Sequence, residues 1–332
     1  MGSVGALLVL IVVAALVFDY INGFHDTANA IATVVSTRVL TPLQAILMAA
    51  TLNFAGALIA SNVAHTIAEG IIVTSVATET VVLAAVVGGI VWNLITWVYG
   101  IPSSSSHALI GGLIGAGAAA AGLDAVQWHG LVDKVLIPLV SSPIAGFIVG
   151  NLLMRLITRY FQNANPHRAG QTFRHLQRLS SATMAFAHGQ NDAQKSMGVI
   201  TLALFAHKLI KTPDVPVWVI LACATAMALG TSAGGWRIIR TMGHRIMRME
   251  PVNGFAAETS GAAVILTASY FGMPVSTTHV LAGSIFGVGT SKGLRTVRWT
   301  VAQRMVVAWV LTIPAAATIG GLTYGLLHLT GL

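Results

Sequence analysis

The chain has 332 residues, of which 55% are hydrophobic and only 8% are charged, with a formal net charge of +8. A soluble globular domain carries about a quarter charged residues, so this composition excludes one. The positive charge does not indicate nucleic-acid binding, because most Lys and Arg residues gather around position 38 and in the ranges 155–178, 237–248 and 292–304. Such clustering is typical of the cytoplasmic loops of membrane proteins. With a mean hydropathy of +0.79, the chain is predicted to be an all-α polytopic membrane protein.

The first half, residues 1–160, is predicted to form one structural repeat. Its apolar segments are long enough for membrane helices, which need about 20 residues. We expect the first segment to be broken at Asn22-Gly23, where polar residues interrupt the apolar run. The predicted elements are a span at 4–35, a span at 43–61, a hairpin at 76–123 and a span at 131–159.

A second repeat is predicted over residues 180–332, after a polar, basic segment at 161–179 that we interpret as a cytoplasmic linker. The position of the linker follows from its charge, since basic loops stay in the cytoplasm. The predicted elements are spans at 180–206 and 216–233, a hairpin at 254–291 and a span at 299–327.

Each hairpin must return to the side from which it enters. In the second hairpin, Glu258 and Lys292 leave about 13 uncharged residues per arm, or about 20 Å of helix, against a hydrocarbon core of about 30 Å. The arms are therefore predicted to be re-entrant. Six crossings then place both termini outside the cell and make the halves inverted repeats, an arrangement in which carriers bind substrate at broken helices. The expected location is the plasma membrane.

Two related polar motifs interrupt the apolar sequence. Gly23–Ala30 contains Asp26 and Asn29, and Gly189–Ser196 contains Asp192 at the position equivalent to Asp26. Carboxylates at membrane depth usually mark an ion or transport path. Their oxygens could bind Na⁺ or carry a proton, and Lys195 is expected to be the counter-ion of Asp192. The candidate residues for cation or proton coupling are Asp26, Asn29, Asp192, Asn22, Lys195 and His25, with Asp26, Asn29 and Asp192 as Na⁺ ligands.

A second pair of motifs stands at the hairpin tips. Pro102–His107 recurs as Pro274–His279. Proline suits the start of a helix, and Ser and Thr are strong N-caps. Helix N-termini carry partial positive charge and free N–H groups, so two tips could hold one tetrahedral oxyanion such as phosphate. The candidate anion ligands are Ser103, Ser104, Ser105, Ser106, Ser276, Thr277 and Thr278, with Asn191 added from the second Asp motif.

At these residues the chain resembles the PiT family of inorganic phosphate transporters. The resemblance rests on the motifs Gly23–Ala30, Ala187–Lys195, Pro102–His107 and Pro274–His279 and covers essentially the whole chain. It implies secondary active phosphate uptake driven by Na⁺ or H⁺, an inverted-repeat fold and a homodimer. The substrate would lie at the hairpin tips and the cations at the Asp/Asn motifs. His25 stands where many members have Asn, which removes an amide ligand and favours protons.

Other functions fit the sequence less well than phosphate symport. A sulfate permease would use a similar anion site, but Asp acceptors beside the anion favour phosphate, which carries protons near neutral pH. An anion channel would need a continuous polar pore, which two closed tips would interrupt. The sequence has no nucleophile paired with a base, so nothing in it indicates an enzyme. It also has no G-x-x-x-x-G-K-[ST] loop, the motif expected for ATP binding. No cofactor other than the coupling ion is expected.

Overall fold

The computed structural model describes residues 5–59, 62–69 and 71–331. Within these ranges the regular elements are helices, with one isolated β-bridge between Ile72 and Val126, which confirms the all-α prediction. The elements of the first half are α1 (Ala6–Ser36), α2 (Pro42–Ala57), α3 (Asn62–Glu69), η1 (Thr74–Val76), α4 (Glu79–Tyr99), α5 (Ser105–Ala121), η2 (Leu123–Ala125), α6 (Trp128–Leu131), η3 (Val132–Leu136) and α7 (Ile137–Phe161). Those of the second half are α8 (Pro166–Ala206), α9 (Val217–Ala233), α10 (Trp236–Arg240), η4 (Thr241–Arg245), α11 (Pro251–Tyr270), α12 (Thr277–Ser291), η5 (Leu294–Thr296) and α13 (Trp299–Leu329).

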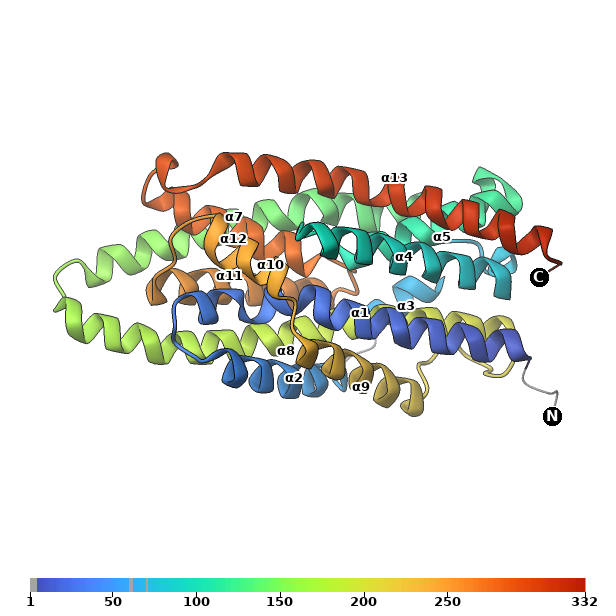
Figure 1. Ribbon diagram of the computed structural model, residues 1–332, viewed down its shortest axis with the longest axis horizontal. Coiled ribbons are helices and arrows are strands. Elements are labelled where there is room, and N and C mark those ends of the chain that lie inside the picture. The colour runs from blue at the N-terminus through green and yellow to red at the C-terminus, as the bar shows by residue number, and fades with distance from the viewer. Residues whose placement is uncertain (1–4, 60–61, 70, 332) are drawn as a thin grey trace.

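The two halves repeat one order of elements in opposite directions. α1 and α8 run antiparallel through the middle of the bundle (Figure 1). The N-terminal end of α1 and the C-terminal end of α13 lie at the same end of the molecule. Even a backbone detail recurs, because Arg38 after α1 and Lys208 after α8 both have φ of 57°. The repeats are also intertwined, since α7 packs on α12 of the other half and α13 packs on α5.

The predicted break at Asn22-Gly23 is wrong, because α1 is helical from Ala6 to Ser36 without interruption. Gly23 serves close packing instead: a Cβ atom there would lie 2.4 Å from the carbonyl oxygen of Met227 in α9. The bends lie in the neighbouring elements. α2 and α3 meet at 70°, and α9 and the α10–η4 segment meet at 60°. Each half therefore has a broken helix one element later than the sequence indicated.

The polar segment at 161–179 is mostly helix and not a linker. α7 continues to Phe161 and α8 begins at Pro166, so only residues 162–165 connect them. The side chain of Asn165 caps α8 by accepting hydrogen bonds from the backbone N–H groups of His167 (3.0 Å) and Arg168 (3.3 Å). Asn-Pro marks a loop in many contexts, but here it is an N-cap followed by proline in the first helical turn.

By length and hydropathy, four continuous helical segments in the described ranges could each cross a membrane: α1, α4, Trp128–Phe161 and α13. Counting each bent pair as one span raises the number to six. α8, which covers the predicted span at 180–206, is not among them because Asn191, Asp192 and Lys195 lower its hydropathy. α8 needs little lipid-facing surface, since these three side chains are buried in the protein.

The hairpins α4–α5 and α11–α12 enter from opposite ends of the bundle and turn near its middle (Figure 1). α5 has 17 residues and α12 has 15, about 26 Å and 22 Å of helix, which is less than a membrane core of about 30 Å. The other arms, α4 and α11, have 21 and 20 residues, about 30 Å each, so length alone does not make them re-entrant. The tips, Gly100–Ser104 and Gly272–Ser276, meet: the Ser106 hydroxyl just beyond the first donates to the carbonyl of Val275 in the second at 3.3 Å.

Small residues allow the helix backbones to approach closely. A Cβ atom on Gly283 of α12 would lie 2.2 Å from the carbonyl oxygen of Pro143 in α7, and one on Gly115 of α5 would lie 1.9 Å from that of Ala317 in α13. Such small-residue contacts are the usual means of helix association in membranes, where apolar burial contributes little between helices. The glycines therefore hold the hairpins against the outer helices.

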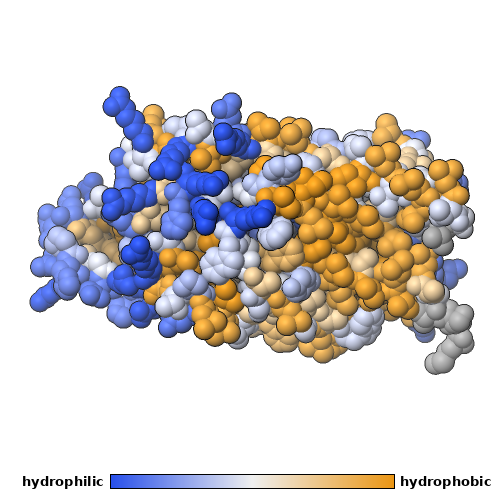
Figure 2. All heavy atoms as spheres, viewed as in Figure 1, coloured by the Kyte–Doolittle hydropathy of each residue, from blue (hydrophilic) through white to orange (hydrophobic). Residues whose placement is uncertain are grey.

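The surface is divided into an apolar band and a hydrophilic end (Figure 2). The apolar side chains of α7 and α13 point outward, while many polar side chains are buried. This distribution is the reverse of that in a soluble protein and suits a lipid surround. Large exposed apolar residues on these two helices include Val140, Ile144, Ile148, Leu152, Val307, Val310, Leu311, Leu322 and Leu326.

Candidate functional site

Two helix N-termini meet in the interior. α5 begins at Ser105 with Ser104 as its N-cap, and the Ser104 hydroxyl accepts from the backbone N–H of His107 at 3.2 Å. α12 begins at Thr277 in the same way, with Ser276 accepting from the N–H of His279 at 3.2 Å. All these residues are at most 2% exposed. The first N–H groups and dipoles of two helices are thus directed at one buried region, which favours an anion.

Asp26 lies beside the first of these helices. Its Oδ2 atom accepts a hydrogen bond from the Ser105 hydroxyl at 3.1 Å, and Thr278 of the second tip helix lies 3.5 Å from Oδ1. The Nδ1 atom of His25 is 2.6 Å from Oδ1. Asp26 therefore touches both hairpins and has an imidazole as its nearest nitrogen.

A chain of polar groups continues from His25 into α4. Its Nε2 atom lies 3.0 Å from the Thr96 hydroxyl, and the Ser103 hydroxyl donates to Thr96 at 2.9 Å. Ser103 was predicted to be an anion ligand, but its hydroxyl is turned toward Thr96 and His25. The sequence analysis missed Thr96, because a single threonine between Trp92 and Tyr99 carries no distinguishing pattern.

Asp192 occupies the equivalent place in the second half. Its Oδ2 atom accepts a hydrogen bond from the Thr277 hydroxyl at 3.1 Å, which matches the bond from Ser105 to Asp26. Lys195 donates to Oδ1, as the counter-ion interpretation predicts. The Nε2 atom of His188 lies 3.1 Å from Oδ2, so Asp192 is contacted by two nitrogen-bearing side chains within one helix.

The two asparagines connect each motif to the hairpins. The Asn29 amide nitrogen donates to the hydroxyls of Thr277 (3.1 Å) and Thr278 (2.8 Å), both from the other half of the chain. In the orientation that satisfies both ends of its amide, Asn191 donates to Asp192 Oδ1 (3.3 Å) and to the Val275 carbonyl (3.1 Å), and accepts from Ser269 (2.8 Å). Both predicted residues therefore reach the second tip.

One predicted residue stands apart from this cluster. Asn22 is fully buried, and its amide forms no hydrogen bond with any described residue. Conversely, His188 belongs to the cluster: its ring, Asp26 and Asp192 each offer an atom within 4.8 Å of the others, a group that could hold a cation. The spacing of His188 and Asp192, four residues apart on one helix, was the signal that could have found it. Asn29, the third predicted Na⁺ ligand, is linked to Asp192 through Thr277 and to Asp26 through Thr278, and its Oδ1 atom has no hydrogen-bond partner among the described residues.

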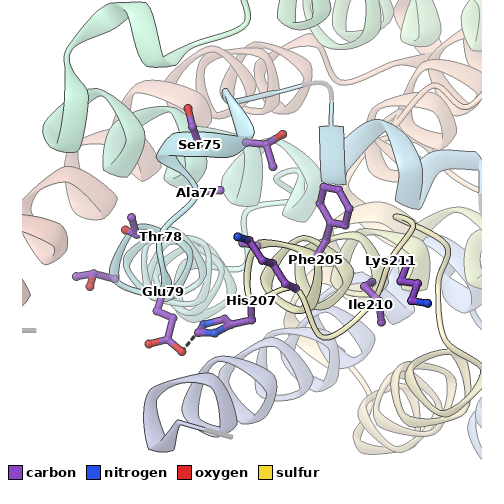
Figure 3. Close-up of a pocket in the computed structure, with 12 residues that line it drawn as sticks. Ser75, Ala77, Thr78, Glu79, Phe205, His207, Ile210 and Lys211 are labelled. Carbon is purple, nitrogen blue, oxygen red and sulfur yellow. Dashed lines mark ion pairs between the residues drawn. The ribbon is translucent and has the colours of Figure 1, made fainter. Parts of the chain in front are cut away.

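A separate cavity of about 770 Å³ lies toward the end of the molecule that holds the N-terminus of α1 and the C-terminus of α13. It lies between the segment before α4 and the end of α8, and the carboxylate of Glu79 and the His207 ring form an ion pair of 2.5 Å at its edge (Figure 3). The lining also contains Lys208 and Lys211. None of the predicted site residues lines it, so it is distinct from the buried cluster.

The fold and the cluster together define a class of protein. Carboxylates, a lysine and two helix N-termini are enclosed in the middle of a helical membrane bundle built from opposed halves. Buried ionisable groups of this kind mark transport paths, and opposed repeats with broken helices are typical of transporters. The protein is a membrane transporter.

Comparison with known proteins identifies the family. Residues 22–320 match the family described as "Phosphate transporter family", and the chain belongs to it. It is 49% identical over 326 residues to a protein of Bacillus subtilis (strain 168), covering 97% of this chain and 98% of that protein, and 48% identical to one of Rhizobium meliloti (strain 1021), covering 96% of each. Both are described as a "probable low-affinity inorganic phosphate transporter".

A solved structure is also similar over nearly the whole chain. It is described as "The sodium-dependent phosphate transporter", with a TM-score of 0.91, 26% sequence identity and coverage of 98% of this chain and 100% of that one. These matches confirm the predicted resemblance. The family is one of transporters and not of enzymes, in agreement with the sequence analysis.

Proposed function

We propose that the protein imports inorganic phosphate across the plasma membrane in symport with a cation, and that it alternates between outward-open and inward-open forms. The observation that carries this proposal is the convergence of two capped helix N-termini with Asp26 and Asp192 in one buried cluster. The names of the relatives supply the substrate class. We expect the termini to be extracytoplasmic and the functional unit to be a homodimer, as the sequence analysis predicts.

Phosphate would bind between the tips. The first N–H groups of α5 and α12, those of Ser105, Ser106, Thr277 and Thr278, precede the capped N–H groups of His107 and His279 and have no partner within their helix. The hydroxyls of Ser105, Thr277 and Thr278 line the same region, where they now bond to Asp26, Asp192 or Asn29. A phosphate that carries a proton could donate to one of the two carboxylates, whereas sulfate has no proton to donate near neutral pH. This difference favours phosphate over sulfate in such a site.

We propose H⁺ as the coupling ion. In each half, a nitrogen already occupies the place beside the carboxylate that a metal cation would need: His25 at Asp26 and Lys195 at Asp192. An imidazole ring can both donate and accept a proton through its two nitrogens, and His25 is within hydrogen-bond distance of both Asp26 and Thr96. A proton could therefore pass between His25 and Asp26 without a metal ligand shell.

Na⁺ is the rival coupling ion. Two observations favour it: the similar solved structure is described as sodium-dependent, and Asp26, His188 and Asp192 have ligand atoms within 4.8 Å of one another. Hard cations such as Na⁺ take oxygen ligands, and the unpaired Asn29 oxygen would add one more. The rival mechanism would require Lys195 to leave Asp192 or share it with the ion.

Transport by the purified protein in liposomes distinguishes coupling to H⁺ from coupling to Na⁺. Labelled phosphate uptake is measured under an inward proton gradient, under an inward Na⁺ gradient at equal pH, and with neither. We expect the proton gradient alone to accelerate uptake. Acceleration by Na⁺ alone would replace H⁺ with Na⁺ and leave phosphate symport intact. Phosphate uptake under neither gradient, with labelled sulfate accumulated instead, would overturn the proposed substrate.

A further inference from the structure

A second basic region lies outside the buried cluster, against the first hairpin tip. A cavity of about 390 Å³ is lined by Arg237, Arg240 and Arg245 and by the backbone segment Val98–Gly100. We call it the arginine pocket. It lies at the hydrophilic end of the apolar band, where hydrophilic side chains gather over α10 (Figures 1 and 2). The positive-inside rule assigns that end to the cytoplasm.

None of the three guanidinium groups forms an ion pair with a carboxylate of the described residues. Arg237 donates through Nη1 to the Val98 carbonyl at 2.5 Å and stacks over the Trp97 ring at 5.2 Å. Among the described residues, neither Arg240 nor Arg245 has a carboxylate within ion-pair distance. Three positive charges therefore line one cavity, and no described carboxylate pairs with them. Guanidinium groups are the side chains best suited to bind phosphate oxygens in pairs.

The internal repeat shows that this charge is not needed to hold the hairpin. In the other half, Asn62 of α3 donates to the Tyr270 carbonyl at 3.0 Å and Thr66 donates to the Gly272 carbonyl at 2.7 Å. These bonds mirror those from Arg237 to Val98 and from Thr241 to Gly100, the latter at 2.9 Å. Each short helix thus holds the hairpin of the opposite half.

Only the helix at the basic end adds guanidinium groups to this arrangement. The position of Arg240 in α10 corresponds to His65 in α3, which lies 4.0 Å from the carboxylate of Asp214. A neutral residue, Asn62, makes the equivalent backbone bond to the hairpin, so holding the hairpin does not require an arginine. The positive-inside rule accounts for basic residues at this end, but it does not require three of them to line one cavity.

We propose that the arginine pocket binds a phosphate group and that its occupant stabilises the first hairpin. The group would come either from the headgroup of an anionic phospholipid or from free inorganic phosphate. An anion there would relieve the repulsion among the three guanidinium groups and so keep Arg237 bonded to Val98, next to the tip that carries Ser104. Tyr99 and Trp236 at the pocket are 73% and 46% exposed, and such residues favour the membrane interface.

The test compares two double variants with the same loss of charge. Arg240→Gln with Arg245→Gln removes two pocket arginines that hold no described partner. Arg159→Gln with Arg178→Gln is the control, because both side chains are exposed near the hydrophilic end and away from the pocket. The unfolding temperature of each protein is measured in nanodiscs of phosphatidylcholine, with and without phosphatidylglycerol. A headgroup site predicts that phosphatidylglycerol stabilises wild type and control more than the pocket variant.

The second arm tests free phosphate as the source. It uses phosphatidylcholine alone, with inorganic phosphate added, and a background of Ser105→Ala with Thr277→Val to weaken the central site. Stabilisation by phosphate in this background, lost when the pocket changes are added, would assign the site to the free anion. If the pocket variant responds to both phosphatidylglycerol and phosphate as the control does, the proposal is overturned. Neither arm depends on transport, so the proposed function could fail while this site is confirmed.

Discussion

The carboxylates of Asp26 and Asp192 come from opposite halves of the chain, yet they have oxygen atoms within 4.8 Å of each other. Two like charges so close in a buried region repel strongly unless a cation or proton is shared between them. Lys195 compensates Asp192, and His25 contacts Asp26. The charge balance of this pair therefore decides which cation the site can accept.

The first prediction concerns the two aspartates. Asp26→Asn and Asp192→Asn keep the shape of the side chain but remove its charge and its ability to take up a proton. We expect phosphate uptake into proteoliposomes to fall to the level of protein-free liposomes in each variant, while membrane insertion and dispersity on gel filtration are unchanged. Uptake at the wild-type rate in either variant would contradict the site.

The second prediction uses the internal repeat. Lys195 stands where the first half has Asn29, each three residues after its aspartate. Lys195→Asn removes the ammonium group from Asp192 and offers an amide oxygen in its place. We expect uptake that is independent of Na⁺ in the wild type to become Na⁺-stimulated in this variant.

The matched control is Lys195→Met, which removes the charge without adding a ligand and should be inactive with or without Na⁺. A Lys195→Asn variant with wild-type uptake and no response to Na⁺ would show that the lysine does not occupy a cation position.

Much of the fold could be predicted because long apolar runs identify membrane helices, and because the Asp and Pro-Ser motifs recur in the same order in both halves of the sequence. The second hairpin was inferred from arms bounded by Glu258 and Lys292, but Glu258 lies buried inside α11, which has 20 residues. The break at Asn22-Gly23 could not be predicted correctly: a glycine beside polar residues fits both a helix break and a close helix contact, and only the position of Met227 in α9 decides between them.

The candidate site was partly visible for the same reason. Buried acids and capping serines stand out in apolar sequence, so Asp26, Asp192, Ser104 and Ser276 could be found. Contacts between distant segments could not. Thr96 joins the site only because α4 packs against α1, and its sequence surroundings are ordinary.

The third prediction concerns the tip hydroxyls. Ser105 and Thr277 make equivalent hydrogen bonds to Asp26 and Asp192. Each of Ser105→Ala and Thr277→Val removes a hydroxyl that the proposed site offers to phosphate, and a hydrogen bond to a charged partner is worth about 1.5–3 kcal/mol. We expect each to weaken phosphate binding by about tenfold or more in isothermal titration. Ser291→Ala, at the far end of α12, is the control and should bind normally. Unchanged isotherms for both tip variants would count against the two-tip site.

The fourth prediction tests the helix contact beside the site. A Cβ atom on Gly189 would lie 2.2 Å from the carbonyl oxygen of Asn53, whereas one on Gly170 in the same helix would meet nothing within 4 Å. Gly189→Ala should therefore separate α8 from α2 and lower both the unfolding temperature and uptake, and Gly170→Ala should change neither. Equal effects of the two substitutions would contradict this packing.

The fifth prediction concerns Glu258, a fully buried acid on α11. Its carboxylate accepts hydrogen bonds from Thr33 of α1 and from Ser180 (2.5 Å) and Gln177 (3.3 Å) of α8, so it ties three helices together. Glu258→Gln replaces the oxygen that accepts from Ser180 with an NH₂ group, so the Ser180 hydroxyl must turn to accept, and hydrogen bonds to a carboxylate become bonds to an amide, at a cost of about 1 kcal/mol.

The control for Glu258 is Glu250→Gln. Glu250 pairs with Lys292 at the surface, at 3.1 Å, and such pairs contribute about 0–1 kcal/mol. Calorimetry in detergent should show a lower unfolding temperature for Glu258→Gln than for Glu250→Gln. A reversed order would show that the buried carboxylate does not hold α1, α8 and α11 together.

The central claim is that this chain couples phosphate to a cation through the buried aspartates. Its most direct test is the uptake of labelled phosphate into proteoliposomes against a phosphate gradient, driven by an imposed inward proton gradient, with wild type and Asp26→Asn compared side by side. We predict accumulation above the external concentration in the wild type and none in the variant. Phosphate that only equilibrates under every proton or Na⁺ gradient, at the same rate in both proteins, would contradict the claim.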